Sequence, residues 1–119
     1  MYTCQKADEY IEKNRVDRAD KPEFHLTTPV GWLNDPNGFS IYGGKAHLFY
    51  QFHPYSTEWG PMHWGHSTSD DFIRWEELPT ALAPDSDYDA FGCFSGTAIE
   101  NDGKHVLFYT GVVEEKLAD

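Results

Sequence analysis

Gly38-Phe-Ser-Ile-Tyr-Gly-Gly-Lys-Ala-His-Leu-Phe-Tyr50 is the stretch that decides the fold of this chain of 119 residues. Residues 38–42 and 46–52 are rich in the aromatic and β-branched side chains that favour strands. Gly43-Gly44 lies between them and tolerates the positive φ angles of a tight hairpin turn. The stretch therefore predicts a β-hairpin.

A similar hairpin pattern returns later in the chain, over Gly96-Thr-Ala-Ile-Glu-Asn-Asp-Gly-Lys-His-Val-Leu-Phe-Tyr109. Lys45 has its counterpart in Lys104, 59 residues further on. Two more strands are expected between the hairpins, at 63–68 and 72–78, so one repeat holds about four strands. A repeat of this size is typical of a β-propeller blade. The alternative is a chance similarity between two hairpins.

The expected fold is all-β and incomplete. A propeller closes only with four or more blades, and this chain holds about one and a half. We therefore expect either a fragment or the start of a truncated gene. Ahead of the strands, apolar residues share one face of a short helix expected over 4–14. The predicted division is an N-terminal helix and linker at 1–22, followed by an incomplete propeller domain at 23–119.

The charge of the chain excludes several partners. Nine Lys and Arg against 20 Asp and Glu give a net charge of −11, which repels phosphate backbones and anionic lipid surfaces. We expect no nucleic-acid or membrane partner, because no stretch reaches the roughly 20 apolar residues of a membrane span. Residues 1–20 carry charges throughout instead of an apolar signal core, so a cytoplasmic location is expected. The aromatic content of 16% suits either sugar binding or ordinary β-structure.

Metal and cofactor chemistry is not indicated. Cys4 and Cys93 are too few for a metal cluster or a disulfide framework, and Cys93 is interpreted as a small buried residue. His63 and His66 are three positions apart on an expected strand, so they should point to opposite faces. No phosphate-binding glycine loop and no known Ser or Cys nucleophile motif is present.

One carboxylate has an unusual setting. Asp35 lies between two amides in Trp32-Leu-Asn-Asp-Pro-Asn-Gly38. Pro36 disfavours the α region for Asp35, and Asn37-Gly38 accept positive φ, so a rigid tight turn is expected. An ordinary surface turn is the alternative. Sugar hydrolysis needs two carboxyl groups, and Asp35 is the candidate nucleophile. Other acidic residues, expected in solvated loops or turns, have no comparable setting: Glu58, Asp70, Asp71, Asp85, Asp87 and Asp89.

These residues resemble glycoside hydrolase family 32, the invertases and other β-fructosidases. The resemblance covers about three-quarters of the chain, from Phe24 to Gly111, and the N-terminal part looks most like the bacterial intracellular sucrases of the family. The motifs that carry it are Trp32-Leu-Asn-Asp-Pro-Asn-Gly38, Phe49-Tyr-Gln-Phe-His-Pro54, Glu58-Trp-Gly60, Met62-His-Trp-Gly-His66, Ser69-Asp-Asp-Phe-Ile-Arg-Trp75, Leu78-Pro-Thr-Ala-Leu-Ala-Pro84 and Phe94-Ser-Gly96.

The resemblance implies a five-bladed β-propeller followed by a β-sandwich. It implies a retaining mechanism in which Asp35 attacks the anomeric carbon of a β-fructofuranosyl unit and forms a covalent fructosyl-enzyme. Asn34 would hydrogen-bond the fructose, and Trp32 and Leu33 would shape the same wall. The other implied sugar contacts come from the first blade and the start of the second: Gln51, Trp59, Phe94 and Ser95. No cofactor is implied, because carboxyl groups alone perform the reaction.

The chain departs from the family in one respect. The transition-state stabiliser of the family lies in an Arg-Asp-Pro motif and its proton donor in a Glu-Cys motif, and neither occurs in this sequence. General acid catalysis contributes about 10²–10⁴-fold, so this chain alone should be nearly inactive. We expect the N-terminal portion of an enzyme that acts on sucrose or sucrose 6-phosphate. The alternatives are a fragment that at most binds fructosyl sugars, and a related five-bladed furanosidase acting on arabinan or another fructan.

Overall fold

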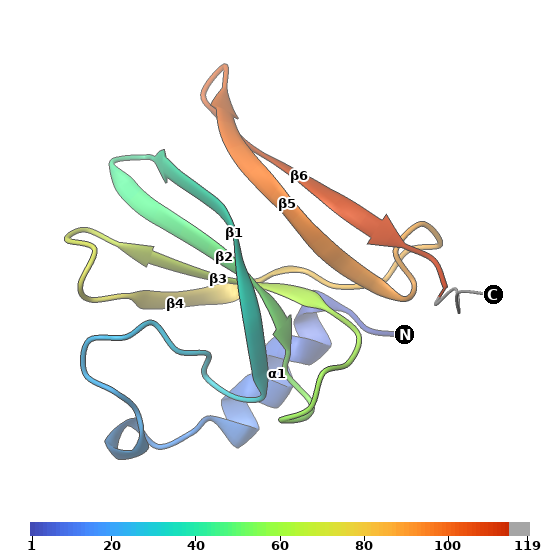
Figure 1. Ribbon diagram of the computed structural model, residues 1–119, viewed down its shortest axis with the longest axis horizontal. Coiled ribbons are helices and arrows are strands. Elements are labelled where there is room, and N and C mark those ends of the chain that lie inside the picture. Colours follow the sequence, from blue (N-terminus) through green and yellow to red (C-terminus); the bar gives the residue numbers. More distant parts are fainter. Residues whose placement is uncertain (115–119) are drawn as a thin grey trace.

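The computed structural model describes residues 1–114; the last five residues of the expected domain 23–119 lie outside this part. The predicted helix is present with its predicted bounds, and the rest is mostly β-structure (Figure 1). Within the described residues the elements are α1 (Cys4–Asn14), η1 (Arg18–Asp20), β1 (Trp32–Tyr42), β2 (Lys45–His53), β3 (His63–Ser69), β4 (Glu76–Leu82), β5 (Gly92–Asn101) and β6 (Lys104–Val112).

The strands form two sheets. The first has the order β1-β2-β3-β4, with every neighbouring pair antiparallel, and the second is the β5-β6 hairpin. Both predicted hairpins are therefore confirmed. In Figure 1 the β5-β6 hairpin rises beside β1, the strand at the inner end of the first sheet. One four-stranded unit followed by the first half of another is the arrangement expected of consecutive propeller blades.

The first strand is longer than predicted. β1 begins at Trp32 rather than at residue 38, because the chain stays extended through Pro36 and pairs with β2 as far as His53. The expected tight turn around Asp35 was therefore wrong, and this residue lies within a strand.

The fourth strand begins later than predicted, at Glu76 rather than at residue 72. Oδ1 of Asp71 accepts hydrogen bonds from the backbone N–H groups of Ile73, at 2.9 Å, and Arg74, at 2.8 Å. These bonds hold the apolar stretch in a turn, where Phe72 has a φ of 65°.

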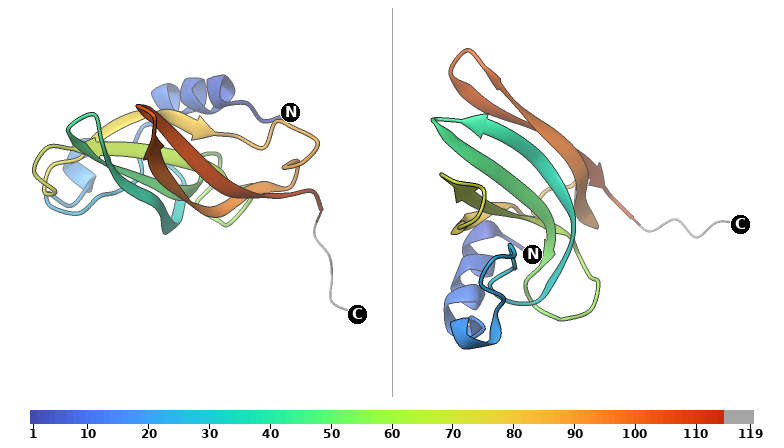
Figure 2. Two further views of the ribbon diagram at one scale, coloured as in Figure 1. Left: turned by 90° about the horizontal axis from the view of Figure 1, so that it is seen from above. Right: turned by 60° about the vertical axis from the view of Figure 1, so that its left-hand side comes forward.

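Two apolar clusters lie on opposite faces of the first sheet. Neighbouring residues of a strand point to opposite faces, so Phe49 of β2 packs toward the β5-β6 hairpin with Trp64 and Cys93. Tyr50 packs toward the other face, in a cluster with Phe52 and with Ile11 of α1. Figure 2 shows α1 and the β5-β6 hairpin on the two sides of this sheet.

Helix α1 covers β4, the outer strand of the first sheet. Thr3 caps its N-terminus by accepting a hydrogen bond from the N–H of Lys6. Oδ1 of Asp8 accepts a hydrogen bond of 2.8 Å from the backbone N–H of Thr80 in β4. The helix therefore satisfies a polar group on a strand edge that would otherwise be open. Over residues 1–114, no helix is long and apolar enough to cross a membrane.

Candidate active site

Asp35 lies in a β-bulge. Leu33 pairs with Phe52 and Pro36 with Tyr50, so Asn34 and Asp35 together face the single residue Gln51 on β2. A bulge of this kind bends the strand and re-aims side chains, and bulges are frequent beside active sites. Asp35 is exposed here, while Gln51 opposite it is buried.

A second bulge follows four positions along β1. Asn37 pairs with Phe49 and Ser40 with His47, which leaves Gly38 and Phe39 opposite one residue. Gly38 has a φ of 57°, and a Cβ there would lie 2.8 Å from the ring of Phe49. The Asn-Gly pair predicted to permit positive φ does so through its glycine, and this position accepts no side chain.

Trp32 and Asn34 form one wall beside Asp35. Nε1 of the Trp32 indole donates a hydrogen bond of 2.8 Å to Oδ1 of Asn34, so the two side chains share one face of β1. Strand alternation places Leu33 on the other face. The structure therefore groups Trp32 with Asn34, and leaves Leu33 apart from them.

Gln51 connects the two blades. Its side chain is only 3% exposed. Nε2 donates to Oδ1 of Asn37 at 2.9 Å and to the backbone carbonyl of Cys93 at 3.0 Å. Cys93 immediately precedes Phe94 and Ser95, so this amide ties the Asp35 bulge to the expected contacts on β5.

Phe94 and Ser95 lie at a third bulge. Phe94 pairs with Thr110 and Gly96 with Tyr109, so Ser95 is the additional residue of β5. Nε1 of Trp64, in the first blade, donates a hydrogen bond of 3.1 Å to the carbonyl of Phe94. The backbone of this segment is therefore held by the neighbouring sheet as well as by its own.

An aromatic group adjoins Phe94. The ring of Trp59, 48% exposed, lies 5.9 Å from that of Phe91 and 6.1 Å from that of Phe94. Phe91 also lies 6.1 Å from Phe94. Sequence reasoning included Trp59 and Phe94 and missed Phe91. Its position just before Gly92-Cys93-Phe94 was the available signal.

Asp89 is the one acidic residue whose predicted environment was clearly wrong. It is 2% exposed rather than solvated. Its carboxylate accepts hydrogen bonds from the hydroxyl of Tyr109, at 2.7 Å, and the N–H of Ser86, at 2.9 Å. Burial, together with the hydrogen bond to Asp89, raises the pKa of Tyr109. These bonds give Asp89 a structural role in the loop before β5. Glu58, Asp85 and Asp87 are exposed, as predicted.

The histidines of β3 point to opposite faces, as predicted. His63 packs against Tyr2 and Tyr55 near α1, whereas His66 lies 2.9 Å from Nδ1 of His47 at the junction with the β5-β6 hairpin. Burial lowers the pKa of His63 and of His66 to about 4 in each case. Among residues 1–114, no group of three or more His, Cys, Asp or Glu side chains is arranged to hold a metal ion.

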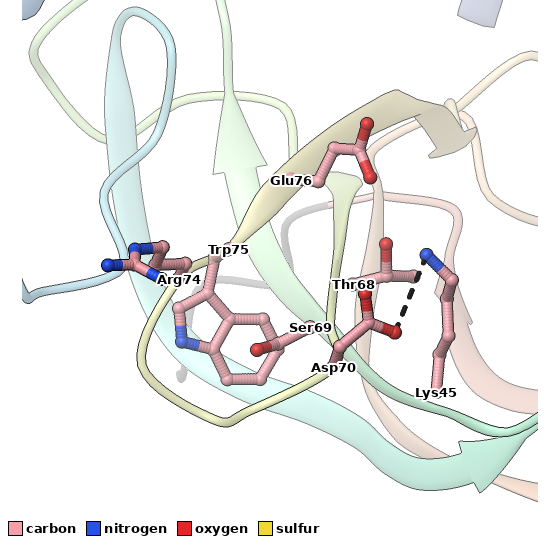
Figure 3. A pocket seen from close by; sticks show the side chains of 7 residues that line it. All are labelled: Lys45, Thr68, Ser69, Asp70, Arg74, Trp75 and Glu76. Carbon is pink, nitrogen blue, oxygen red and sulfur yellow. Dashed lines mark ion pairs between the residues drawn. The ribbon is translucent and has the colours of Figure 1, made fainter.

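A separate hollow of about 180 Å³ lies at the other end of the first blade (Figure 3). It is lined by residues of the loop between β3 and β4, including Trp75, and by an ion pair of 3.7 Å between Lys45 and Asp70. It shares no residue with the Asp35 region. We assign it no part in the chemistry of Asp35.

The fold and this site define a class. The site is an exposed carboxylate at a bulge of β1, on the strand that also carries Trp32 and Asn34, and this strand belongs to a four-stranded unit of the kind that builds β-propellers. The profile of the glycosyl hydrolases family 32 N-terminal domain matches residues 25–119. The chain therefore belongs to glycoside hydrolase family 32.

Individual relatives agree with this assignment. A sucrose-6-phosphate hydrolase of Zymomonas mobilis is 54% identical over 90 residues, which are 76% of this chain and 18% of the relative. A raffinose invertase of Escherichia coli is 53% identical over 107 residues, or 88% of this chain and 22% of the relative. The structure of a mutant family 32 β-fructofuranosidase of Bombyx mori in complex with sucrose superimposes with a TM-score of 0.85 at 48% identity. It is matched over 95% of this chain and 24% of its own.

These coverages bear on the fold. The chain spans about a fifth of the length of the curated relatives it matches, and it corresponds to the N-terminal portion of their propeller. The prediction of the first one and a half blades, preceded by a short helix, is confirmed.

Proposed function

We propose that this chain forms the N-terminal part of a retaining β-fructosidase that hydrolyses sucrose or sucrose 6-phosphate. The observation that carries the proposal is the placement of Asp35, exposed at a bulge where it and Asn34 lie opposite the buried Gln51. The relatives named above include a sucrose-6-phosphate hydrolase and a structure in complex with sucrose, which supports a sugar substrate of this kind.

In the proposed reaction, a carboxylate oxygen of Asp35 attacks the anomeric carbon of the fructosyl unit. The bond from that carbon to the glucosyl oxygen breaks, and its electron pair leaves with the oxygen, which takes a proton from a general acid. Water then attacks the same carbon and gives its proton to the conjugate base of that acid, and the Asp35 carboxylate is released. The two carboxyl groups of a retaining enzyme lie about 5–5.5 Å apart.

Asp35 suits the role of nucleophile because it is accessible. Asp35 is exposed, and no ion pair engages it within residues 1–114, so a substrate can reach its carboxylate. Asn34 and Gln51 would hold the sugar hydroxyls, and the faces of Trp32, Trp59 and Phe94 would pack on the rings. The proton donor and the stabiliser must come from residues that this sequence does not contain.

The experiment that tests the proposal uses the complete enzyme. This is the product of the whole reading frame that contains the chain. Where that frame ends at residue 119, it is a chimaera in which the chain replaces the matching segment of the Escherichia coli sucrose-6-phosphate hydrolase, 55% identical over 92 residues. Its kcat and KM are measured on sucrose and on sucrose 6-phosphate. Turnover of either substrate with release of fructose supports the proposal. Isolation at low pH of a covalent fructosyl-enzyme that yields fructose supports it as well.

A second function is favoured by one observation, the absence of the Arg-Asp-Pro and Glu-Cys motifs. A reading frame that also lacks these motifs downstream would encode a protein that binds fructosyl sugars without hydrolysing them. Calorimetric binding of sucrose with no turnover identifies this alternative, and lack of both turnover and binding excludes the two functions together.

A further inference from the structure

The side chain of Asn37 belongs to a buried network that the nucleophile role of Asp35 does not explain. Asn37 is 5% exposed and Gln51 is 3% exposed. Nδ2 of Asn37 donates a hydrogen bond of 2.9 Å to the carbonyl of Pro36. Oδ1 of Asn37 accepts from Nε2 of Gln51, which also donates to the carbonyl of Cys93. The network therefore runs from β1 through β2 to β5.

The two ends of this network fix the direction of every hydrogen bond in it. Backbone carbonyls are acceptors only, so the carbonyl of Pro36 requires the amide nitrogen of Asn37 and the carbonyl of Cys93 requires that of Gln51. Oδ1 of Asn37 is then left facing Nε2 of Gln51. Both N–H bonds of Nε2 are used inside the protein, and Oε1 is the only polar atom that Gln51 can offer a ligand.

Gln51 lies where its orientation affects both halves of the site. It opposes the bulge formed by Asn34 and Asp35, and its second hydrogen bond holds the residue that precedes Phe94. A carboxamide rotated by half a turn would set its oxygen against two acceptors, Oδ1 of Asn37 and the carbonyl of Cys93. Electrostatic repulsion in a buried site makes that orientation costly.

We propose that Asn37 is a positioning residue, which fixes the carboxamide of Gln51 so that Oε1 accepts a hydrogen bond from a hydroxyl of the fructosyl unit. This inference rests on the proposed function, because it assigns the polarity of one sugar contact in that site. It makes two statements that are separately measurable. Asn37 acts through Gln51, and the sugar hydroxyl that meets Gln51 is a donor.

The first statement is tested by a double-mutant cycle in the complete enzyme, with Asn37→Ala, Gln51→Ala and the double variant. A hydrogen bond to the substrate is worth about 1–2 kcal/mol, so Gln51→Ala should lower kcat/KM by about 5- to 30-fold. Asn37→Ala should lower it by about tenfold, and the double variant should be no worse than Gln51→Ala alone. If the loss of kcat/KM in the double variant equals the product of the two single losses, Asn37 acts independently of Gln51 and the proposal is overturned.

Ser40→Ala is the matched control. Ser40 also lies on β1, and its hydroxyl makes a hydrogen bond of 2.8 Å to Nε2 of His105 across the same junction of blades. The variant should lower the melting temperature about as much as Asn37→Ala while kcat/KM stays within about twofold of wild type. Where Asn37→Ala yields no folded protein, Asn37→Ser takes its place, because its hydroxyl is too short to reach Gln51.

The second statement is tested with sucrose analogues in which single fructosyl hydroxyls are replaced by hydrogen or by fluorine. Fluorine can accept but not donate a hydrogen bond. At one hydroxyl, both replacements should lower kcat/KM more in wild type than in Gln51→Ala or Asn37→Ala, because these variants lack the oriented acceptor. A fluorine penalty that is equal in wild type and in both variants at every hydroxyl would overturn the proposal.

The same analogues are also measured by calorimetric binding to the Asp35→Asn enzyme. This separates the failure of the inference from the failure of the proposed function. If wild type binds the analogues without turning over sucrose, the proposed hydrolytic function is wrong. The binding data still test the polarity of the Gln51 contact. If the enzyme turns over sucrose but the double-mutant cycle is additive, the proposed function is supported and the positioning role of Asn37 is excluded. Absence of both turnover and binding overturns both.

Discussion

Asp35 is accessible because β1 carries two residues, Asn34 and Asp35, where β2 carries only Gln51. In a regular ladder, Asp35 would face one side of the sheet in strict alternation with its neighbours. The bulge frees the carboxylate from this alternation, and the buried Gln51 opposite it bonds to the side chain of Asn37 and to the carbonyl of Cys93.

Asp35→Asn in the complete enzyme should abolish turnover and leave the fold intact. The amide cannot form the covalent bond to fructose, so kcat should fall by at least about 10³-fold, or about 4 kcal/mol of activation free energy. The exposed position predicts a melting temperature close to wild type. The measurements are initial rates on sucrose, sucrose binding by calorimetry, and thermal unfolding.

Asp87→Asn is the control for this change, because Asp87 is an exposed acidic residue in the loop before β5. It should keep wild-type kcat. Equal rates for wild type and Asp35→Asn would remove Asp35 from the chemistry.

At the scale of residues, the sequence identified the types of side chain and not their pairing. Asp35, Gln51, Trp59 and Phe94 were all predicted from motifs, and the structure brings Gln51 next to the segment that contains Phe94. The bulge could not be predicted, because the number of residues that face each other depends on two strands at once. Phe91 was missed because only its place beside the Phe94 segment pointed to it, and its contact with Trp59 joins residues far apart in the sequence.

At the scale of elements, hydrophobic spacing worked where one element decides its own structure. Ala7, Tyr10 and Ile11 on one face predicted α1; Ala7 and Ile11 are buried and Tyr10 is partly buried. The same reasoning placed the fourth strand too early, because it counted Phe72 and Ile73 as strand residues. Two backbone N–H groups of this stretch donate to the side chain of Asp71 instead of to a neighbouring strand. These local hydrogen bonds favour a turn despite the apolar side chains.

The contact between α1 and β4 predicts a loss of stability in Asp8→Ala. Without this carboxylate the N–H of Thr80 loses its partner, and the free energy of unfolding should fall by about 1–3 kcal/mol. Glu9→Ala removes the same charge from the exposed side of α1 and should cost clearly less. The measurement is urea unfolding of the complete enzyme. Equal costs for the two variants would show that charge, and not the edge contact, matters.

The junction between the two sheets predicts a pH effect. His66 of β3 lies against His47 of β2, which in turn contacts His105 of β6. Burial, followed by the charges of these two imidazoles, lowers the pKa of His66 to about 4. The pKa of His105 is also lowered by burial and by His47, although the carboxylate of Glu100 on β5 opposes this. Both folded-state pKa values are therefore below the ordinary value of about 6.5, so the native state holds fewer protons than the unfolded state from about pH 6.5 down toward pH 4, the value for His66.

Stability should consequently be lost as the pH falls from about 6.5 toward 4, where the unfolded chain binds the additional protons. In His66→Gln, one titrating group of this cluster is replaced by a neutral amide, so the melting temperature should depend less on pH over this window. The measurement is thermal unfolding of the complete enzyme at pH 7 and pH 4.5 for both proteins. An unchanged difference between the two pH values would show that His66 does not contribute.

At the scale of the whole molecule, repeat spacing predicted the number of blades but not how they meet. The hairpin pattern returning after 59 residues implied one and a half blades. Their relative placement is set by contacts between residues far apart in the sequence, such as those of Gln51 with Cys93 and of Trp64 with Phe94. Such contacts leave no periodic signal in a single sequence.

Residues 1–119 expressed alone should self-associate. The β5-β6 hairpin pairs with no further strand within the described residues, and Ile99 and Phe108 are both more than half exposed on it. Unpaired strand edges and apolar surface promote association between chains. The measurement is size-exclusion chromatography with light scattering, followed by thermal unfolding. A monodisperse monomer that melts cooperatively would contradict this expectation.

The position of α1 ahead of the blade it covers has a consequence for biosynthesis. The ribosome releases α1 before β4, so the helix that covers this outer strand has already been synthesised when the strand emerges. The elements that pack on the first sheet, α1 and the β5-β6 hairpin, are therefore synthesised before and after it. Folding in the order of synthesis is general for N-terminal units. Within residues 1–114, the far edge of the β5-β6 hairpin has no such earlier partner.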